Sequence, residues 1–227
     1  MSGGGDYNGR APGRPQSPTL CYAAPFAAGD HDRHMSKRYI TPQELLADAF
    51  ALGWQVFASG FRPDYVVGVW RGGTPVGIAV HELLQLLGVS ADHTAVRTAS
   101  YSGIARREER VQVDGLDYLR QRLAPGQALL LVDDVYDTGL SLQQVVTELR
   151  ADPAGAGIDI RLATPWFKPG NNRTGMRPDY FLHETDNWLV FPHELDGLSL
   201  QELEANKPEL AAVLAQLKTA LAGHKPA

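Results

Sequence analysis

The sequence predicts an α/β protein in which a mostly parallel, twisted sheet is flanked by helices. Two observations support this fold class. Short apolar runs typical of buried strands alternate with amphipathic runs typical of helices, and the connections between them are short. In addition, residues 129–132 are four apolar residues in a row, which suits a strand that is covered on both faces of a sheet. We therefore expect helices on both sides of the sheet.

Length and composition narrow the range of functions. The chain has 227 residues, of which 44% are hydrophobic, enough for one core of ordinary size. Its net charge of -5 argues against a main role in binding nucleic acid, which needs a basic face. The single cysteine, Cys21, excludes a disulfide framework, and no apolar run approaches the ~20 residues that span a bilayer. We expect a cytoplasmic protein without a membrane partner.

Three segments differ in composition. Residues 1–34 are rich in Gly, Pro and Ser and have no periodicity, which predicts a disordered N-terminal tail. Residues 35–198 contain the alternating strands and helices and are expected to form one domain. Residues 199–227 have leucines at helical spacing on both sides of Pro208, which predicts a C-terminal helical extension.

The first helix and strand of the domain have clear signals. Residues 41–44, Thr-Pro-Gln-Glu, form a capping box with proline at the first helical position, so a helix is expected over residues 42–59. The β-rich run at Tyr65–Trp70 predicts the first core strand. Together they place a helix and a strand in the order that an α/β sheet requires.

A cation and two glycines follow this strand, at Arg71, Gly72 and Gly73. Thr74 as the cap and Pro75 as the first helical residue then predict a helix to about Leu87. Glycines at the positive end of a helix permit close backbone approach to an anion. Taken alone, however, these residues favour a tight turn with a surface arginine over an anion site, because Gly-Gly turns are common.

The remaining elements follow in the same alternation. Residues 100–110 are polar, charged and contain glycine, which predicts a mobile loop with some β-ribbon character. The other expected elements are a strand at 94–98, a short helix at 116–123, a helix at 139–150, strands at 158–163 and 180–183, and an apolar segment at 188–192.

An acidic loop directly follows the strand at 129–132. It contains Asp133, Asp134 and Asp137, and small residues at the start of a helix come next. Ligands of open α/β sheets bind outside the carboxyl ends of the strands. A carboxylate loop with free backbone amides at this place indicates a phosphorylated sugar as the ligand.

Each part of this loop suits one part of a ribose 5-phosphate. Backbone amides and hydroxyls at the helix start can bind a dianionic phosphate, and they belong to Thr138, Gly139, Leu140 and Ser141. Asp133 and Asp134 can accept hydrogen bonds from two vicinal hydroxyls. Carboxylates repel a nearby phosphate unless a divalent cation intervenes, so Mg²⁺ is implied as part of the substrate. Asp137 at the bend remains free to exchange a proton with a bound base.

These residues resemble a known family. Residues 129–141, LLLVDDVYDTGLS, are similar to the phosphoribosyl pyrophosphate signature of type I phosphoribosyltransferases, and the resemblance extends over about residues 39–196. Residues 69–73 resemble that family's pyrophosphate loop, in which a cis peptide is common. Ser100 and Tyr101 lie where the family has Ser-Tyr on a flexible lid. Lys168 with the segment from Trp188 resembles the small C-terminal hood of the 6-oxopurine branch.

The resemblance implies a function and a set of roles. The fold would be the type I phosphoribosyltransferase fold, and the reaction a Mg²⁺-dependent transfer from phosphoribosyl pyrophosphate to a purine in salvage. Asp137 would be the acid/base at purine N7, Lys168 would bind O6, Trp188 would stack on the base, and the backbone of Leu189 would contact its 2-position. A homodimer or homotetramer is expected.

Two points of this assignment stay open at the level of sequence. Either Glu194 or Asp196 matches the family's acidic residue near the metal and pyrophosphate. His183 and His193 flank the hood, where a structural role is favoured over contact with the base.

Three alternatives compete with this assignment. Asp133, Asp134 and Asp137 also fit the D-D-x-x-D metal motif of isoprenoid synthases, but that motif lies on a long helix, whereas here a strand precedes it and Gly139 follows it. A nucleotide-sensing regulator of the same fold that binds nucleic acid is the second, and the acidic net charge weighs against it. The third is a phosphoribosyltransferase acting on a different base.

Overall fold

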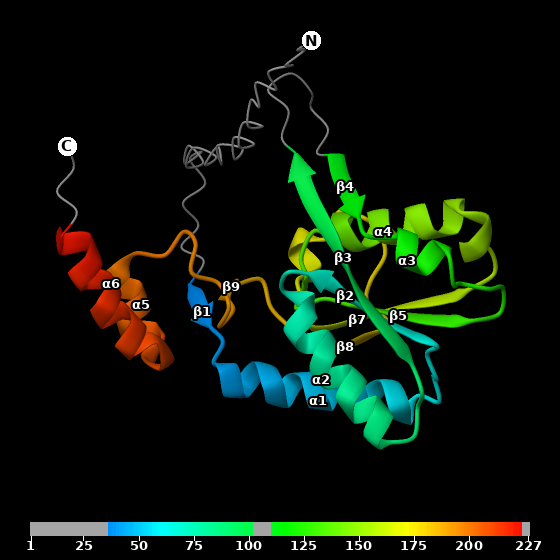
Figure 1. Cartoon of the computed structure of the whole chain (residues 1–227), viewed down its shortest axis with the longest axis horizontal. Coiled ribbons are helices and arrows are strands. Elements are labelled where there is room, and N and C mark those ends of the chain that lie inside the picture. The colour runs from blue at the N-terminus through cyan, green and yellow to red at the C-terminus, as the bar shows by residue number, and fades with distance from the viewer. Residues whose placement is uncertain (1–35, 102–109, 224–227) are drawn as a thin grey trace, which may run out of the picture. The chain divides into compact units, whose positions relative to one another are not determined.

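A computed structural model of the protein describes residues 36–101 and 110–223 (Figure 1). The tail predicted at 1–34 and residues 102–109 of the predicted polar loop lie outside these residues. Within the described ranges, every helix is too short or too polar to cross a membrane.

A seven-stranded sheet confirms the predicted α/β class. Its strand order is β4-β3-β2-β5-β7-β6, and β8 also pairs with β7. All neighbours are parallel except β3 and β4, which are antiparallel. The strands are β2 (Tyr65–Trp70), β3 (Asp92–Tyr101), β4 (Arg110–Asp114), β5 (Ala128–Val132), β6 (Val135–Tyr136), β7 (Asp159–Phe167) and β8 (Tyr180–Glu184).

Helices cover both faces of the sheet (Figure 1). On one face lie α1 (Pro42–Ala58) and α2 (Gly73–Leu86), and on the other α3 (Asp117–Arg120) and α4 (Leu140–Ala151). Strand β5 shows why both are needed. Leu130 and Val132 pack into the core with α1 and α2, whereas Leu129 and Leu131 pack into the core with α4. Because side chains alternate along a strand, four apolar residues in a row require two apolar layers.

A second, two-stranded sheet joins the start of the described chain to a segment that follows the main sheet. Strand β1 (Lys37–Tyr39) pairs in parallel with β9 (Trp188–Val190). After β9 come α5 (Leu200–Asn206) and α6 (Ala211–Gly223), where the helical extension was predicted. A capping box between Ser199 and Glu202 starts α5. We refer to residues 188–196 as the hood segment.

Several boundaries differ from the sequence predictions. Helix α2 begins at Gly73, so Gly72 and not Thr74 is the cap, and the Thr74 hydroxyl donates instead to the Arg71 carbonyl at 2.7 Å. Strand β7 extends to Phe167, beyond the predicted end at 163, because β6 and β8 both pair with its second half. Strand β1 was not predicted. The described ranges also contain three 3₁₀ turns: Pro153–Gly155, Pro169–Asn171 and Pro208–Leu210.

The predicted polar loop begins and ends as a β-ribbon. Strands β3 and β4 pair out to Ser100 with Val111 and Tyr101 with Arg110. The backbone of the two predicted lid residues therefore belongs to the end of β3.

Candidate active site

The acidic loop connects β5 to α4 through the short strand β6. Gly139 ends the loop with φ 79° and forms the N-cap of α4. A Cβ at this position would lie 2.4 Å from Tyr136 Oη, so both the backbone angle and the close contact require glycine. The Tyr136 hydroxyl is fixed in turn by the Thr174 hydroxyl at 2.7 Å. A cavity of ≈ 70 Å³ lies along the loop and includes Asp137, Thr138 and Ser141 in its lining.

The turn at Arg71, Gly72 and Gly73 packs directly against the acidic loop. β2 and β5 are parallel neighbours, so both turns leave the sheet at the same edge. A Cβ on Gly72 would lie 2.0 Å from Asp134 Oδ2, and a Cβ on Gly73 would lie 2.3 Å from the Val132 carbonyl oxygen. The two glycines are therefore required by close packing between two predicted parts of the site. The peptide Trp70–Arg71 is cis, and Trp70 is 57% exposed.

The two adjacent carboxylates are electrostatically unfavourable as anions. Burial, and next the charge of Asp134, raise the pKa of Asp133 well above its usual value, while the Asp134 and Gly73 amides donate to its carboxylate and oppose the shift. Asp134 is 7% exposed, and its Oδ2 lies 3.2 Å from His193 Nε2. A cation or a pair of hydroxyl donors would stabilise both carboxylates. The described residues contain no group of three or more His, Cys, Asp or Glu that could hold a metal ion alone.

Asp137 accepts hydrogen bonds on both of its carboxylate oxygens. Lys168 Nζ donates to its Oδ2 at 3.0 Å, and Asn171 Nδ2 donates to its Oδ1 at 2.8 Å. Lys168 is only 6% exposed, and its backbone N–H donates to the Tyr136 carbonyl at 2.9 Å. The lysine thus follows β7 directly and presents its ammonium to the bend of the acidic loop. Two predicted site residues 31 positions apart thus form an ion pair in which Lys168 is buried and Asp137 is partly exposed.

The hood segment places its predicted residues differently. Trp188 is 57% exposed, with Lys37 Nζ 5.8 Å from its ring centroid, whereas Leu189 is buried. Glu194 Oε2 accepts from the Phe191 backbone N–H at 3.0 Å, so this carboxylate closes a turn within the segment. Asp196 is exposed. The loop after Lys168 is tied to the chain before the hood segment, because Gly170 N–H donates to Asp186 Oδ1 at 3.1 Å.

Two residues at the site were not predicted as site residues. Asn171 contacts Asp137, and the only signal in the sequence was its position in a polar loop soon after Lys168. His193 contacts Asp134, although a structural role was favoured for it. His183 does have such a role, since its Nε2 lies 3.0 Å from Asp48 of α1.

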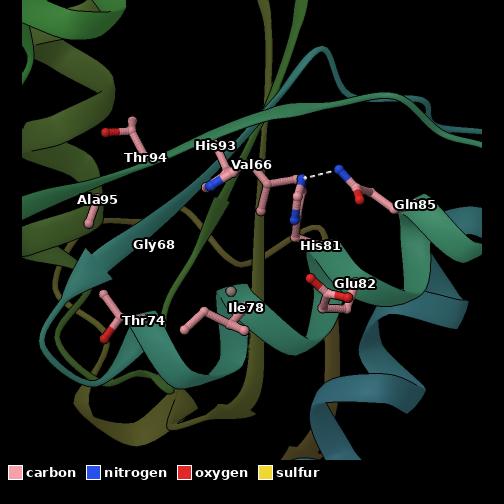
Figure 2. A pocket seen from close by; sticks show the side chains of 11 residues that line it. Val66, Gly68, Thr74, Ile78, His81, Glu82, Gln85, His93, Thr94 and Ala95 are labelled. Atoms are coloured by element: carbon pink, nitrogen blue, oxygen red, sulfur yellow. Dashed lines mark hydrogen bonds between the residues drawn. The ribbon is translucent and has the colours of Figure 1, made fainter.

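A larger cavity, ≈ 420 Å³, lies apart from these residues. It is bounded by α2, β2 and β3, and Figure 2 shows His81, Gln85 and His93 along it. His81 is buried and its Nε2 lies 3.0 Å from the Ala91 carbonyl oxygen, which gives this histidine a role in packing. The acidic loop, Lys168 and the hood segment contribute no residue to its lining.

The fold is that of the type I phosphoribosyltransferase family. The model of the phosphoribosyl transferase domain matches residues 38–197, and the chain belongs to this family. Solved structures agree. A purine phosphoribosyltransferase from Pyrococcus horikoshii is 27% identical, with a TM-score of 0.55, over 72% of this chain and 97% of that one.

Two further structures share the fold. A hypothetical protein from Neisseria gonorrhoeae with bound ppGpp is 21% identical, with a TM-score of 0.60, over 78% of this chain and 99% of that one. The xanthine-guanine-hypoxanthine phosphoribosyltransferase of Helicobacter pylori is 21% identical, with a TM-score of 0.57, over 75% and 99%.

Proposed function

We propose that the protein transfers the 5-phosphoribosyl group of phosphoribosyl pyrophosphate to a 6-oxopurine, giving a nucleoside monophosphate and pyrophosphate. The observation that supports this most is the convergence of three elements at one edge of the sheet. These elements are the acidic loop, the turn at Arg71, Gly72 and Gly73 (the Arg71 turn) and the Lys168–Asp137 pair. Each suits a different part of the two substrates.

The donor would be bound by the acidic loop and the Arg71 turn. Amides at the start of α4 suit the 5-phosphate, and Asp133 and Asp134 suit the ribose hydroxyls. Arg71 and the backbone amides of the Arg71 turn suit the pyrophosphate. Mg²⁺ arriving on the pyrophosphate would supply positive charge next to the two carboxylates, which explains how the unfavourable pair is tolerated during binding.

The Lys168–Asp137 pair matches the edge of a 6-oxopurine. The N7-protonated tautomer presents an acceptor, O6, beside a donor, N7–H. Lys168 Nζ is a donor and Asp137 an acceptor, and they lie 3.0 Å apart, so both could bind this edge at once. Asp137 would take the N7 proton as N9 attacks C1 of the ribose. Adenine presents an amino donor at position 6, which would face the lysine ammonium unfavourably.

The hood segment and the lid would complete the site. Trp188 would stack on the purine and the Leu189 backbone would contact its 2-position. Ser100 and Tyr101 would close over the reacting groups and exclude water. We also expect a homodimer or homotetramer, which light scattering of the purified protein would measure.

The decisive experiment measures pyrophosphate release from phosphoribosyl pyrophosphate and Mg²⁺ with a panel of bases. Hypoxanthine, guanine or xanthine should support turnover, and the kcat/KM for adenine should be lower by about tenfold or more, because a mismatched polar pair costs 1–3 kcal/mol. EDTA is the control for the metal. A preference for adenine or a pyrimidine would contradict the assignment of the base, and nucleic-acid binding without any transfer would favour the regulator.

A further inference from the structure

Lys207, in the C-terminal extension, is the most buried lysine in the part of the chain that the structure describes. It is 2% exposed and lies directly after α5. Burial lowers its pKa, and the nearby charges of Glu209 and Glu194 oppose the shift. Burying an ammonium is costly unless its hydrogen bonds are made inside the protein. A lysine on the surface can be explained by solubility, but a buried lysine such as Lys207 needs a different explanation. By contrast, Lys218 on α6 is half exposed and pairs with Glu204.

The partners of Lys207 are two consecutive carbonyl groups at the start of the turn after β9. Its Nζ donates to the Phe191 carbonyl at 2.6 Å and to the Pro192 carbonyl at 3.2 Å. The same turn is closed from within, because Glu194 N–H donates to the Phe191 carbonyl at 3.0 Å and Glu194 Oε2 accepts from Phe191 N–H. The lysine thus fixes the backbone on both sides of the Phe191–Pro192 bond.

The residue that follows these two carbonyls contacts the acidic loop. His193 Nε2 lies 3.2 Å from Asp134 Oδ2. The imidazole is nearly parallel to the ring of Phe191, with 9° between the planes and 5.7 Å between the centroids. Phe191 is itself almost fully buried. The turn that Lys207 holds therefore sets the orientation of His193. His193 contacts Asp134, the carboxylate that is proposed to bind the ribose.

We propose that the C-terminal extension is a brace for the donor site, in which Lys207 fixes the turn at residues 191–194 so that His193 orients Asp134. Both are positioning residues, since neither is placed against the substrates. The ligand class is a pentose 5-phosphate 1-pyrophosphate, and this rests on the proposed function. A second tie supports the brace. Glu202 of α5 accepts from Lys37 Nζ at 2.5 Å and from Tyr39 Oη at 3.3 Å, both on the strand paired with β9.

Binding of phosphoribosyl pyrophosphate, measured by calorimetry with Mg²⁺ and without a base, tests the brace. Lys207→Met keeps the length of the side chain and removes its donors, and Lys218→Met is the matched control. We expect Lys207→Met and His193→Ala each to weaken donor binding about tenfold, as for loss of a hydrogen bond to a charged group. Lys218→Met should bind as the wild type does. The KM for the purine should change by about twofold or less.

Two comparisons separate positioning from general destabilisation. If Lys207 acts through His193, the double variant should bind the donor no more weakly than the weaker single variant, so the effects are not additive. His193→Gln, which returns a nitrogen donor at similar reach, should recover most of the affinity. If Lys207→Met does not fold, Lys207→Gln replaces it in the cycle.

A third readout needs no substrate. The ¹⁵N resonances of the His193 imidazole, assigned by their loss in His193→Gln, should move in Lys207→Met and stay in place in Lys218→Met. Unchanged resonances together with unchanged donor affinity in Lys207→Met would overturn the brace, as would strictly additive effects in the double variant. A wild type that neither binds the donor nor transfers it would overturn the proposed function, and with it the role of the brace in donor binding. The resonances would still decide whether Lys207 positions His193.

Discussion

The acidic loop and the hood segment are held in place by different kinds of contact. Near neighbours in the sequence hold the loop: Gly139 packs against Tyr136, and the Thr138 hydroxyl accepts from Leu140 N–H at 3.4 Å. The hood segment depends on the far ends of the described chain, since β9 pairs with β1 and Lys207 holds the turn after it. The backbone turn of the acidic loop is thus shaped by residues near it in the sequence, whereas the hood segment is held by distant segments of the chain. We refer to the acidic loop and the turn at residues 71–73, which are proposed to bind the donor, as the donor side, and to Lys168 and the hood segment as the acceptor side.

This difference suggests how the two sides respond to change. A substitution at the donor side should alter geometry that has little room to relax, because glycines there contact backbone and carboxylate atoms at short distance. A substitution in the hood segment outside the turn at residues 191–194 should have a smaller effect, because several weaker contacts hold the segment in place. The four predictions below test this, from the largest effect to the smallest.

Gly73→Ala should abolish measurable transfer. The added Cβ would lie 2.3 Å from the Val132 carbonyl oxygen, a backbone atom that cannot move without shifting β5. Overpacking of this kind typically costs about 1–3 kcal/mol of unfolding free energy. Donor binding by calorimetry and urea unfolding measure both effects.

Gly77→Ala on the same helix is the control for Gly73→Ala. The nearest atom to its Cβ would be 3.4 Å away, an ordinary contact, so this variant should be active and as stable as the wild type or more stable. If Gly73→Ala and Gly77→Ala have the same donor affinity and stability, close packing at the Arg71 turn does not determine donor binding.

Asp137→Asn should lower kcat by about 10²-fold while donor affinity changes little. The amide keeps the shape of the side chain but cannot accept a proton, and general acid/base groups usually contribute at least this factor. Steady-state kinetics with hypoxanthine or guanine, together with donor calorimetry, separate the two quantities. Full turnover in this variant would remove Asp137 from the proton transfer.

Trp188→Ala should raise the KM for the purine about three- to tenfold, because an aromatic contact contributes about 0.5–1.5 kcal/mol beyond its buried area. Donor affinity should remain as in the wild type. Trp54→Ala is a matched control, since Trp54 is also more than half exposed but lies on α1. If Trp188→Ala weakens the donor as much as the purine, the two sides are not independent.

Glu202→Gln should have the smallest effect, a slight decrease in Tm that depends on pH. The hydrogen bond from Lys37, and next those from Ser199, lower the pKa of Glu202 from 4.5 to about 2. Its stabilising contribution is complete above about pH 4.5 and is lost as the pH falls through about 2.

The difference in Tm between Glu202→Gln and the wild type should therefore disappear near pH 2. Scanning calorimetry from pH 7 downward measures it, and Glu184→Gln, an exposed carboxylate 3.8 Å from Arg177, is the control. A difference that persists unchanged at low pH would show that the carboxylate charge is not its cause.

The local structure of the donor side could be predicted largely from sequence, because its signals are local. An apolar run, three aspartates and Thr-Gly in succession specify β5, the loop and the start of α4. The Arg71 turn was also predicted. Its packing against Asp134 was not, because a glycine in the sequence does not indicate which residue lies beside it.

The acceptor side could be predicted only in part. Lys168 was proposed as a site residue from its place along the chain, but its ion pair with Asp137 depends on β6 and β7 pairing over two residues at the end of the sheet. Strand β1 has three residues and no alternation, so its pairing with β9 had no signal. The same holds for Lys207, whose burial results from the packing of the whole extension.

The exposure of the tryptophans has an optical consequence. Trp70 directly precedes Arg71, and Trp188 begins the hood segment, and each is 57% exposed, whereas Trp166 is 1% exposed beneath the guanidinium of Arg38. Intrinsic fluorescence would therefore report from both sides of the site. With Trp54 replaced by phenylalanine, quenching by added pyrophosphate would be assigned to Trp70 and quenching by added purine to Trp188, so that the order of substrate binding could be followed in real time without an attached dye.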